Sequence, residues 1–287
     1  AGPDYVAEHP GSVQQRRDGH LLDCGPGSYY MVPTEDRRRV LRERFRVAFE
    51  NGAQAAAPEE PEYISSGGYS PAFQQEFQRF YGRPWVAPHT SPQARVDCQR
   101  LMGRLQIELL RACYEGARSV KPDAPCFLLA HSPLNYAAWG IMFPHREALA
   151  ELDIAHFIAQ VWTGTARSPI RHMGVRRERT FENAFLEYSS SLNLTRGLGI
   201  QTWLLMDPLE DNPDRSMEDY FDNYKRTLGA ALMFPETDLY EVLPWPTRIF
   251  GRVAPEFATV ICTVVNTLAD MQHHTWFRLD AGTPGIA

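Results

Sequence analysis

The chain has 287 residues, a formal net charge of −6 and no block of lysine and arginine interleaved with aromatic residues. This charge balance does not favour a polyanionic partner, so we expect no binding to nucleic acid. Apolar residues make up 44% and charged residues 22%, which is normal for a globular protein with a sizeable core.

The five cysteines form no Cys-x-x-Cys pair, so the sequence predicts neither a disulfide framework nor a zinc site. Four of them lie among apolar neighbours, as small core residues do. This usage favours a reducing compartment, and therefore a cytoplasmic location. No stretch of the chain is long and apolar enough to cross a bilayer, so we expect no membrane partner.

The first half of the chain begins with a segment rich in Gly and Pro, residues 1–33, which predicts a long polar loop. A helix is expected over 34–50, with acidic residues in its first turn and an Asn-Gly stop after it. The alanine-rich run 53–58 is expected to be a strand because of what flanks it, although alanine is a poor strand former. A Ser-Pro start predicts the next helix over 70–81, and a longer helix is expected over 92–120.

The second half alternates strand-length apolar runs with amphipathic helices. The expected strands are 126–131, 154–162, 200–206 and 239–243, and the expected helices are 149–152, 181–198, 216–234 and 255–271. This alternation predicts parallel βαβ units with both sheet faces covered. No glycine-rich nucleotide motif or phosphate loop follows any strand. Polar and aromatic residues gather at the strand ends instead, which favours an α/β fold of the (β/α)8 TIM-barrel type.

Acidic residues follow two of the expected strands. Glu59, Glu60 and Glu62 crowd around one proline after the first strand, and Asp207 and Glu210 follow a later one. Hydrolysis of a glycosidic bond needs two carboxyl groups on opposite sides of the sugar, and they must come from different strands. Crowding of three acids raises the pKa of at least one, as a general acid requires. The alternative is that the glutamates form a solvated loop end and that Asp207 is a turn residue.

Aromatic residues just after strand ends offer flat faces on which sugars can stack, or they pack beneath loops. They are Tyr63, Trp139, Trp162 and Trp245. His131 and Asn135 are candidates to bind sugar hydroxyls, with a structural hydrogen-bonding role as the alternative. The pair His273 and His274 has no acidic ligand at metal spacing, so we expect no metal and no cofactor.

Several segments resemble a known family. Residues 59–63 (EEPEY), 68–73 (GYSPAF) and 81–85 (YGRPW) resemble the fourth-strand region of clan A glycoside hydrolases. Within that clan they are similar to the group of β-galactosidases and β-mannosidases that carry a flavodoxin-like domain after the barrel. Residues 160–165 (QVWTGT) and 207–213 (DPLEDNP) are similar to later strand ends of relatives of this group.

This resemblance implies a retaining glycosidase of carbohydrate metabolism that acts on O-glycosyl bonds of an oligosaccharide or β-glycoside. The clan has its acid/base after an asparagine at the end of strand four, and its nucleophile at the end of strand seven. Here Glu60 takes the acid/base position, and Glu59 stands where the clan has asparagine. Glu210 becomes the preferred nucleophile because the clan uses glutamate, with Asp207 next, and Trp245 matches an aromatic residue at the floor of the subsite.

The same mapping assigns only strands four to eight to this chain. We therefore expect a partial barrel, the catalytic domain, over 1–252, and a linker helix and the start of a following domain over 253–287. An open five-stranded piece leaves unpaired edges, so we expect a fragment, a chain completed by another segment, or a modified barrel. The resemblance also allows a homo-oligomer, a trimer, formed through the following domain.

Two other functions stay open. The glutamate at the clan's asparagine position and the missing strands favour a catalytically silent carbohydrate-binding barrel or an inactive fragment. A metal-dependent isomerase that uses His131, Asp207 and Glu210 is the third possibility.

Overall fold

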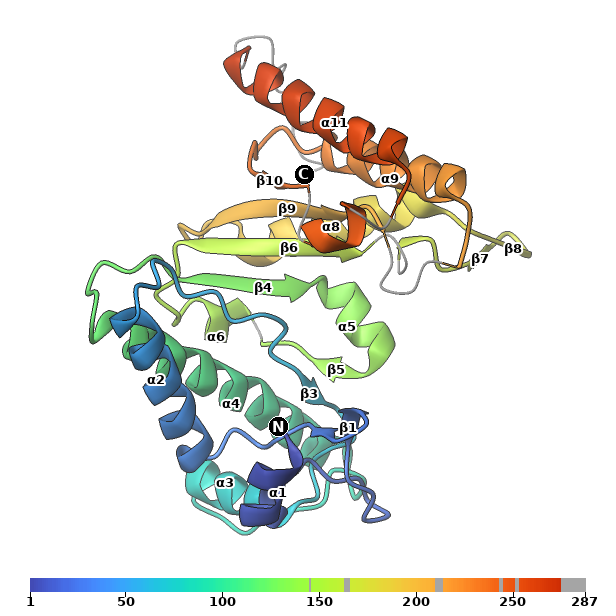
Figure 1. Cartoon of the computed structure of the whole chain (residues 1–287). Coiled ribbons are helices and arrows are strands. Elements are labelled where there is room, and N and C mark those ends of the chain that lie inside the picture. The colour runs from blue at the N-terminus through green and yellow to red at the C-terminus, as the bar shows by residue number, and fades with distance from the viewer. Residues whose placement is uncertain (145, 163–165, 210–213, 243–244, 251–252, 275–287) are drawn as a thin grey trace. The chain divides into compact units, whose positions relative to one another are not determined.

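The computed structural model describes residues 1–144, 146–162, 166–209, 214–242, 245–250 and 253–274, and Figure 1 labels most of their helices and strands. The chain divides into two compact units. Unit 1 comprises residues 1–129 and 135–156, and unit 2 comprises residues 130–134 and 157–287. Each unit is described by itself. The domain boundary expected at residue 252 stays a prediction.

Two long helices of unit 1, α2 (Glu35–Glu50) and α4 (Pro92–Arg118), confirm the sequence expectation. Their starts are fixed by side-chain caps, because the hydroxyl of Thr34 accepts the amide N–H of Arg37 and that of Ser91 accepts the amide of Ala94. The two helices pack against each other closely. Gly116 of α4 lies so near the carbonyl of Arg42 in α2 that a side chain there would collide with backbone.

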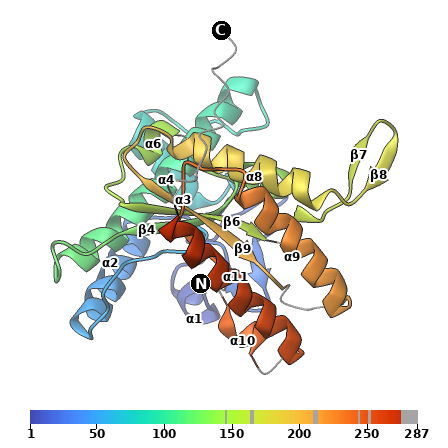
Figure 2. The ribbon, with the colours of Figure 1, turned by 90° about the horizontal axis from the view of Figure 1, so that it is seen from above.

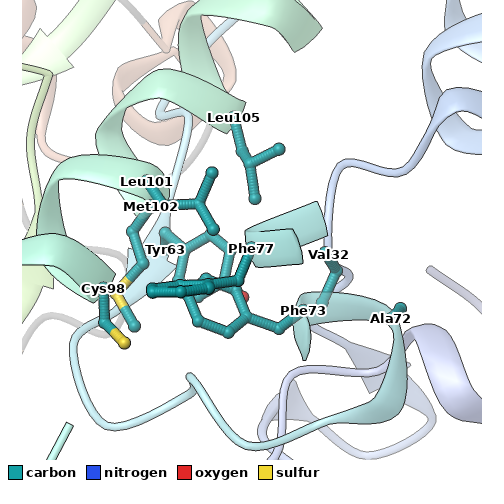
Figure 3. Packing of buried hydrophobic residues seen from close by; sticks show 9 residues of the cluster. All are labelled: Val32, Tyr63, Ala72, Phe73, Phe77, Cys98, Leu101, Met102 and Leu105. Atoms are coloured by element: carbon teal, nitrogen blue, oxygen red, sulfur yellow. The ribbon is translucent and has the colours of Figure 1, made fainter. Parts of the chain in front are cut away.

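The core of unit 1 forms where α3 (Pro71–Tyr81) meets α4. Ser70 caps α3, and Gly82 ends it in the left-handed conformation at a φ of 64°. Buried aromatic and aliphatic side chains interlock there (Figure 3): Val32, Tyr63, Ala72, Phe73, Phe77, Cys98, Leu101, Met102 and Leu105. Full burial of one such large apolar side chain stabilises the fold by about 1.5–3 kcal/mol.

The N-terminal segment is more structured than the expected polar loop. It contains α1 (Pro3–Glu8), the 3₁₀ turn η1 (Pro10–Ser12) and the antiparallel pair β1 (Asp23–Gly25) and β2 (Ser28–Tyr29). The long-loop prediction was therefore wrong. The error arose because the order of this segment depends on contacts with distant parts of the chain. Val13, Leu22 and Val32 are buried, so the segment contributes side chains to the core although its composition is that of a loop.

The alanine-rich run 53–58 is extended and pairs with β4 (Phe127–His131), as expected, but only through isolated bridges. Ala56 pairs in parallel with Cys126, and Glu59 pairs in parallel with Leu129. The amide of Phe127 donates to the carbonyl of Ala56 over 2.8 Å. A short antiparallel pair that the sequence did not predict, β3 (Tyr63–Ile64) and β5 (Ile141–Met142), follows the run.

Unit 2 contains the end of β4 and the strands β6 (His156–Trp162), β9 (Gln201–Asp207) and β10 (Tyr240–Glu241). The strand order is β10-β9-β6-β4, and β10 and β9 are parallel. Strands that neighbour each other in the sheet thus follow one another along the chain, as successive strands of a (β/α)8 barrel do. Among the described residues this α/β arrangement forms a four-stranded sheet and no closed barrel.

In the described part of unit 2, this sheet is accompanied by α8 (Thr180–Thr195), α9 (Met217–Ala231), the short α10 (Pro246–Ile249) and α11 (Pro255–His273). The hydroxyl of Ser216 caps α9 by accepting the amide of Asp219. Helices α8 and α9 pack side by side (Figure 2). The shorter helices α5 (Pro133–Trp139) and α6 (Arg146–Leu149) complete the described elements between β4 and β6.

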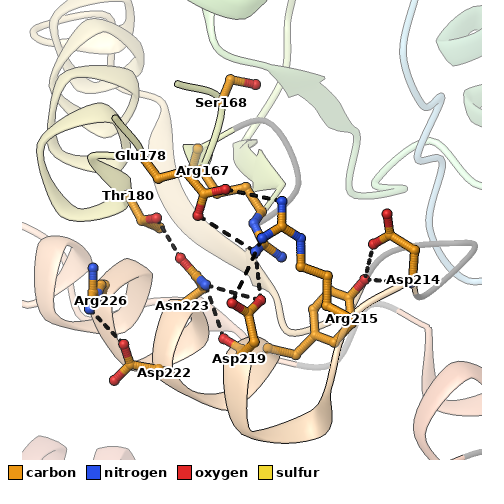
Figure 4. Close-up of polar contacts among 12 residues, drawn as sticks. Arg167, Ser168, Glu178, Thr180, Asp214, Arg215, Asp219, Asp222, Asn223 and Arg226 are labelled. Carbon is orange, nitrogen blue, oxygen red and sulfur yellow. Dashed lines mark hydrogen bonds and ion pairs between the residues drawn. The ribbon is translucent and has the colours of Figure 1, made fainter. Parts of the chain in front are cut away.

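The chain after β6 forms a hairpin of β7 (Ile170–His172) and β8 (Val175–Arg177), which projects away from α8 and α9 in Figure 2. Met173 and Gly174 turn the hairpin with φ of 49° and 81°, which is the two-residue turn that suits the twist of paired strands. An ionic network anchors its base (Figure 4). Arg167, which is 4% exposed, lies 2.5 Å from Asp219 at the start of α9.

No helix in the described part of the chain is long and apolar enough to cross a membrane.

Candidate functional site

Glu60 ends the extended run that pairs with β4, and its backbone is unusual. Its amide donates to the carbonyl of Leu129 over 2.9 Å, so the residue still belongs to the parallel ladder. Its φ is +46°, in the left-handed region that non-glycine residues seldom occupy. Such strain costs about 1–3 kcal/mol and persists where the surrounding structure and the function require it. The end of this run is therefore a candidate site.

The other two glutamates of the cluster lie beside Glu60 on the same cavity, whose volume is about 360 Å³. Glu59 is exposed, and Glu62 is half-buried beside Tyr30. Burial and then the charge and hydrogen bond of Glu62 raise the pKa of the Tyr30 phenol above its usual value. Glu62 thus has a local partner, and the two glutamates before Pro61 stand closer to the strand end.

Asp207 is the last residue of β9 and is buried, with 2% of its surface exposed. Both carboxylate oxygens are engaged: Oδ2 lies 3.0 Å from a guanidinium nitrogen of Arg248, and Oδ1 accepts the amide of Leu209 over 3.4 Å. The Arg248 guanidinium also lies over the ring of Trp245, 4.9 Å from its centre. Strand end, arginine and tryptophan therefore form one small cluster in unit 2. Glu210 lies outside the described residues.

A buried acid that the sequence analysis missed, Glu187 of α8, also belongs to unit 2. Its Oε2 accepts the hydroxyl of Ser132, the residue after β4, over 3.1 Å. Burial raises the pKa of the Glu187 carboxyl to about 7, and the bond from Ser132 opposes that shift. The signal in the sequence was a glutamate three residues after Ala184 and four before Ser191, at the spacing of one helix face, and both of these residues are buried in α8.

The remaining predicted sugar-binding residues divide between the units. His131, at the end of β4, and Trp162, at the end of β6, belong to unit 2. Asn135 and Trp139 lie on α5 in unit 1, where Asn135 is buried and Trp139 is 40% exposed. Trp139 and Trp245 therefore present open ring surface, whereas His131 and Asn135 are almost wholly enclosed.

Tyr63 lies in the apolar core of unit 1, with no exposed surface (Figure 3). Its hydroxyl donates to the carbonyl of Gly67 over 3.4 Å, and burial raises its pKa well above the usual value. The ring thus packs between α3 and α4 and has no surface for a sugar. The aromatic residue of this segment that lines an open cavity is Tyr69.

The arrangement offers acid–base chemistry at two strand ends, at Glu60 in unit 1 and at Asp207 in unit 2. In the described part of the chain, no three His, Cys, Asp or Glu side chains gather as metal ligands do.

Comparison with known proteins gives a match among solved structures. No family model and no curated protein matches the chain. Among solved structures, the crystal structure of a beta-galactosidase from the psychrophilic Marinomonas ef1 matches with a TM-score of 0.59 at 14% sequence identity. The match covers 85% of this chain but 42% of that protein, so the chain spans less than half of its length. The likeness at this identity shows the fold: this chain shares part of the architecture of that β-galactosidase.

Proposed function

We propose that the chain carries the acid/base half of a glycoside hydrolase site, and that the enzyme is a retaining β-glycosidase of the β-galactosidase or β-mannosidase type. The observation that carries the proposal is the left-handed backbone of Glu60 at the end of a strand paired in parallel with β4. Strain of this kind concentrates at functional sites. The fold shared with a β-galactosidase supports the same conclusion.

In this proposal Glu60 protonates the glycosidic oxygen and then, as a carboxylate, activates water for the second step. Glu59, next to it, orients the sugar. Glu210 is the preferred nucleophile. Asp207 is less suited to attack, because one of its oxygens is held by Arg248 and the other by the amide of Leu209. Asp207 then positions Arg248, whose guanidinium lies over the ring of Trp245, the residue that we propose for the subsite floor.

The test is hydrolysis of aryl β-galactosides and β-mannosides by the wild type and by Glu60→Gln, with Glu62→Gln as the matched control. Loss of a general acid lowers kcat by roughly 10²–10⁴-fold. The loss in kcat/KM should be much smaller for a dinitrophenyl glycoside, because kcat/KM reports the first step and this leaving group needs no proton. Azide should restore part of the rate of Glu60→Gln and yield a β-glycosyl azide, because a small nucleophile can replace base-activated water in the second step.

Equal rates for wild type and Glu60→Gln would remove Glu60 from the mechanism. A product of inverted configuration in an NMR time course would exclude the retaining mechanism. Glu62→Gln should stay within about threefold of wild type, since a carboxyl that does not touch the reacting atoms contributes no proton transfer.

The second candidate is a carbohydrate-binding chain without catalysis. The ion pair of Asp207 with Arg248 favours it, because that carboxylate is already neutralised. Calorimetric binding of the same glycosides, with no release of the aryl group by the wild type, would support this candidate over the first.

A further inference from the structure

Three arginines of unit 1 that form no ion pair with a carboxylate of the described residues surround a cavity of about 650 Å³, which we call the arginine pocket. Its lining includes Arg16, Arg17, Arg95, Ser65, Tyr69 and His89. Its volume falls within the range of small-ligand sites, which is about 300–1,000 Å³. The pocket is separate from the cavity that Glu59 and Glu60 line.

The fold places the first two arginines on a closed turn. The amide of Arg16 donates to the carbonyl of His20 over 2.9 Å, and Gly19 makes the turn with a φ of 87°. Gln15, just before the turn, pairs in parallel with Gly68 and accepts the amide of Tyr69 over 3.2 Å. These contacts hold residues far apart in the sequence at one rim.

The third arginine, Arg95, lies in the first turns of α4, where the helix dipole is positive. Arg16, Arg17 and Arg95 are exposed, and none forms an ion pair with a carboxylate of the described residues. Among the described residues of the lining, the one acid is Asp18, whose Oδ1 accepts the amide of His20 over 3.0 Å. The pocket is therefore cationic in a chain whose net charge is −6.

The rest of the lining suits a sugar. Tyr69 is half-buried and fixed, because its hydroxyl bonds to Nδ1 of His89 at 3.0 Å and its ring contacts Trp85 edge-on at 5.8 Å. The flat faces of Tyr69 and Pro88 can cover the apolar face of a sugar ring. Ser65, whose amide donates to Gly140 over 2.7 Å, offers its hydroxyl to a sugar.

We propose that the arginine pocket binds an acidic saccharide, with the anionic group on Arg16, Arg17 and Arg95 and the sugar ring against Tyr69. The guanidinium group binds a carboxylate, sulfate or phosphate through two parallel N–H donors. The choice of a saccharide rests on the proposed function, whereas the choice of an anion rests on the three arginines alone. Ser65 is the residue after β3, which itself follows Glu62, so the pocket is lined by a residue of the chain segment that carries Glu60.

The experiment is isothermal calorimetry of the full chain with galacturonic acid, galactose 6-sulfate and galactose 6-phosphate, each against galactose. The acidic sugars should bind at least roughly tenfold more tightly than galactose, and raising the salt should weaken them. Their ranking distinguishes a carboxylate from a sulfate or phosphate ester as the anion. Arg17→Gln and Arg95→Gln should each weaken binding roughly tenfold. Arg95→Lys should lose part of the affinity, because lysine keeps the positive charge but not the two parallel N–H donors of the guanidinium.

The matched control is Arg100→Gln, which removes an exposed arginine of the same helix outside the pocket. It should leave the affinity unchanged, and an equal loss there would reduce the effect to net charge and overturn the proposal. Equal affinities for galacturonic acid and galactose would overturn it too, as would inorganic sulfate or phosphate binding as tightly as the acidic sugars. If acidic sugars bind in an arginine-dependent way but no aryl glycoside is cleaved, the proposed function is refuted and the binding proposal for the arginine pocket stands.

Discussion

The arginine pocket of unit 1 and the Arg167 network of unit 2 place their charged groups in opposite settings. In unit 1, Arg16, Arg17 and Arg95 stand exposed around an open pocket, and Glu60 is held in a strained conformation. In unit 2, Arg167 is buried against acids, as Figure 4 shows. Exposed groups without partners contribute little to folding and stay available to ligands, whereas buried groups with partners hold the structure together. Substitutions in the arginine pocket or at Glu60 should therefore change binding or activity, and substitutions in the Arg167 network should change stability.

Glu187→Gln should have the largest effect on stability and should test unit 2 through pH. The pKa of this buried acid is raised from 4.5 to about 7, so between those values the folded protein binds a proton that the unfolded chain has lost. Stability therefore falls as pH rises through this window, by up to about 3 kcal/mol. Glutamine keeps the bond from Ser132 and removes the slope. Urea unfolding of both proteins at pH 5 and pH 8 measures the difference.

The stability of Glu187→Gln relative to the wild type should thus increase as the pH rises. An identical pH dependence in the two proteins would mean that Glu187 is not buried as an acid. Glu182→Gln, an exposed glutamate of the same helix, is the control and should leave the slope unchanged.

Arg167→Gln should come next, with a loss of about 2 kcal/mol. Its guanidinium lies 2.5 Å from Asp219 and 3.6 Å from Glu178, and its loss leaves both acids in a partly enclosed site. Breaking a fully buried pair costs about 3–5 kcal/mol, but about a third of the Asp219 side chain is exposed, so solvent reduces the loss. The midpoint of urea unfolding gives the value. A change below 0.5 kcal/mol would remove the distinction between the Arg167 network and the arginine pocket.

Glu60→Gly should have a smaller effect of opposite sign. Glycine accepts a positive φ without strain, so the variant should gain about 0.5–1 kcal/mol in the free energy of unfolding while its glycosidase activity is lost. Glu59→Gly, at a residue outside the positive-φ region, should lose stability instead because glycine gains more freedom on unfolding. Thermal unfolding of the pair decides the sign. Equal losses in both would show that Glu60 carries no strain.

Local signals predicted the elements that depend on local chemistry. Helix α3 begins at the Ser-Pro start and ends at Gly82 because a cap and a left-handed residue act within one turn. Strands β6 and β9 followed from continuous apolar runs, since both are buried along most of their length. The first residues were misjudged, because their burial depends on partners far along the chain, such as Gly68 for Gln15.

The sequence predicted candidate residues where an acidic side chain stands at the end of an expected strand. Glu60 ends the extended run that pairs with β4, and Asp207 is the last residue of β9, whereas their catalytic roles stay predictions. The positive φ of Glu60 and the pairing of Asp207 with Arg248 could not be foreseen, because both depend on three-dimensional contacts. The arginine pocket could not be predicted from the sequence for the same reason, since Arg17 and Arg95 are brought together only by the fold.

Arg17→Gln should have the smallest effect on stability, within about 0.5 kcal/mol of wild type, because the side chain is exposed and forms no ion pair with a described carboxylate. Urea unfolding beside Arg167→Gln makes the comparison directly, since both remove one guanidinium. Equal losses would show that exposure does not separate the arginines of the two units. Galacturonic acid should raise the free energy of unfolding of the wild type. If Arg17→Gln is as stable as the wild type without ligand but is not stabilised by galacturonic acid, Arg17 acts by binding the ligand.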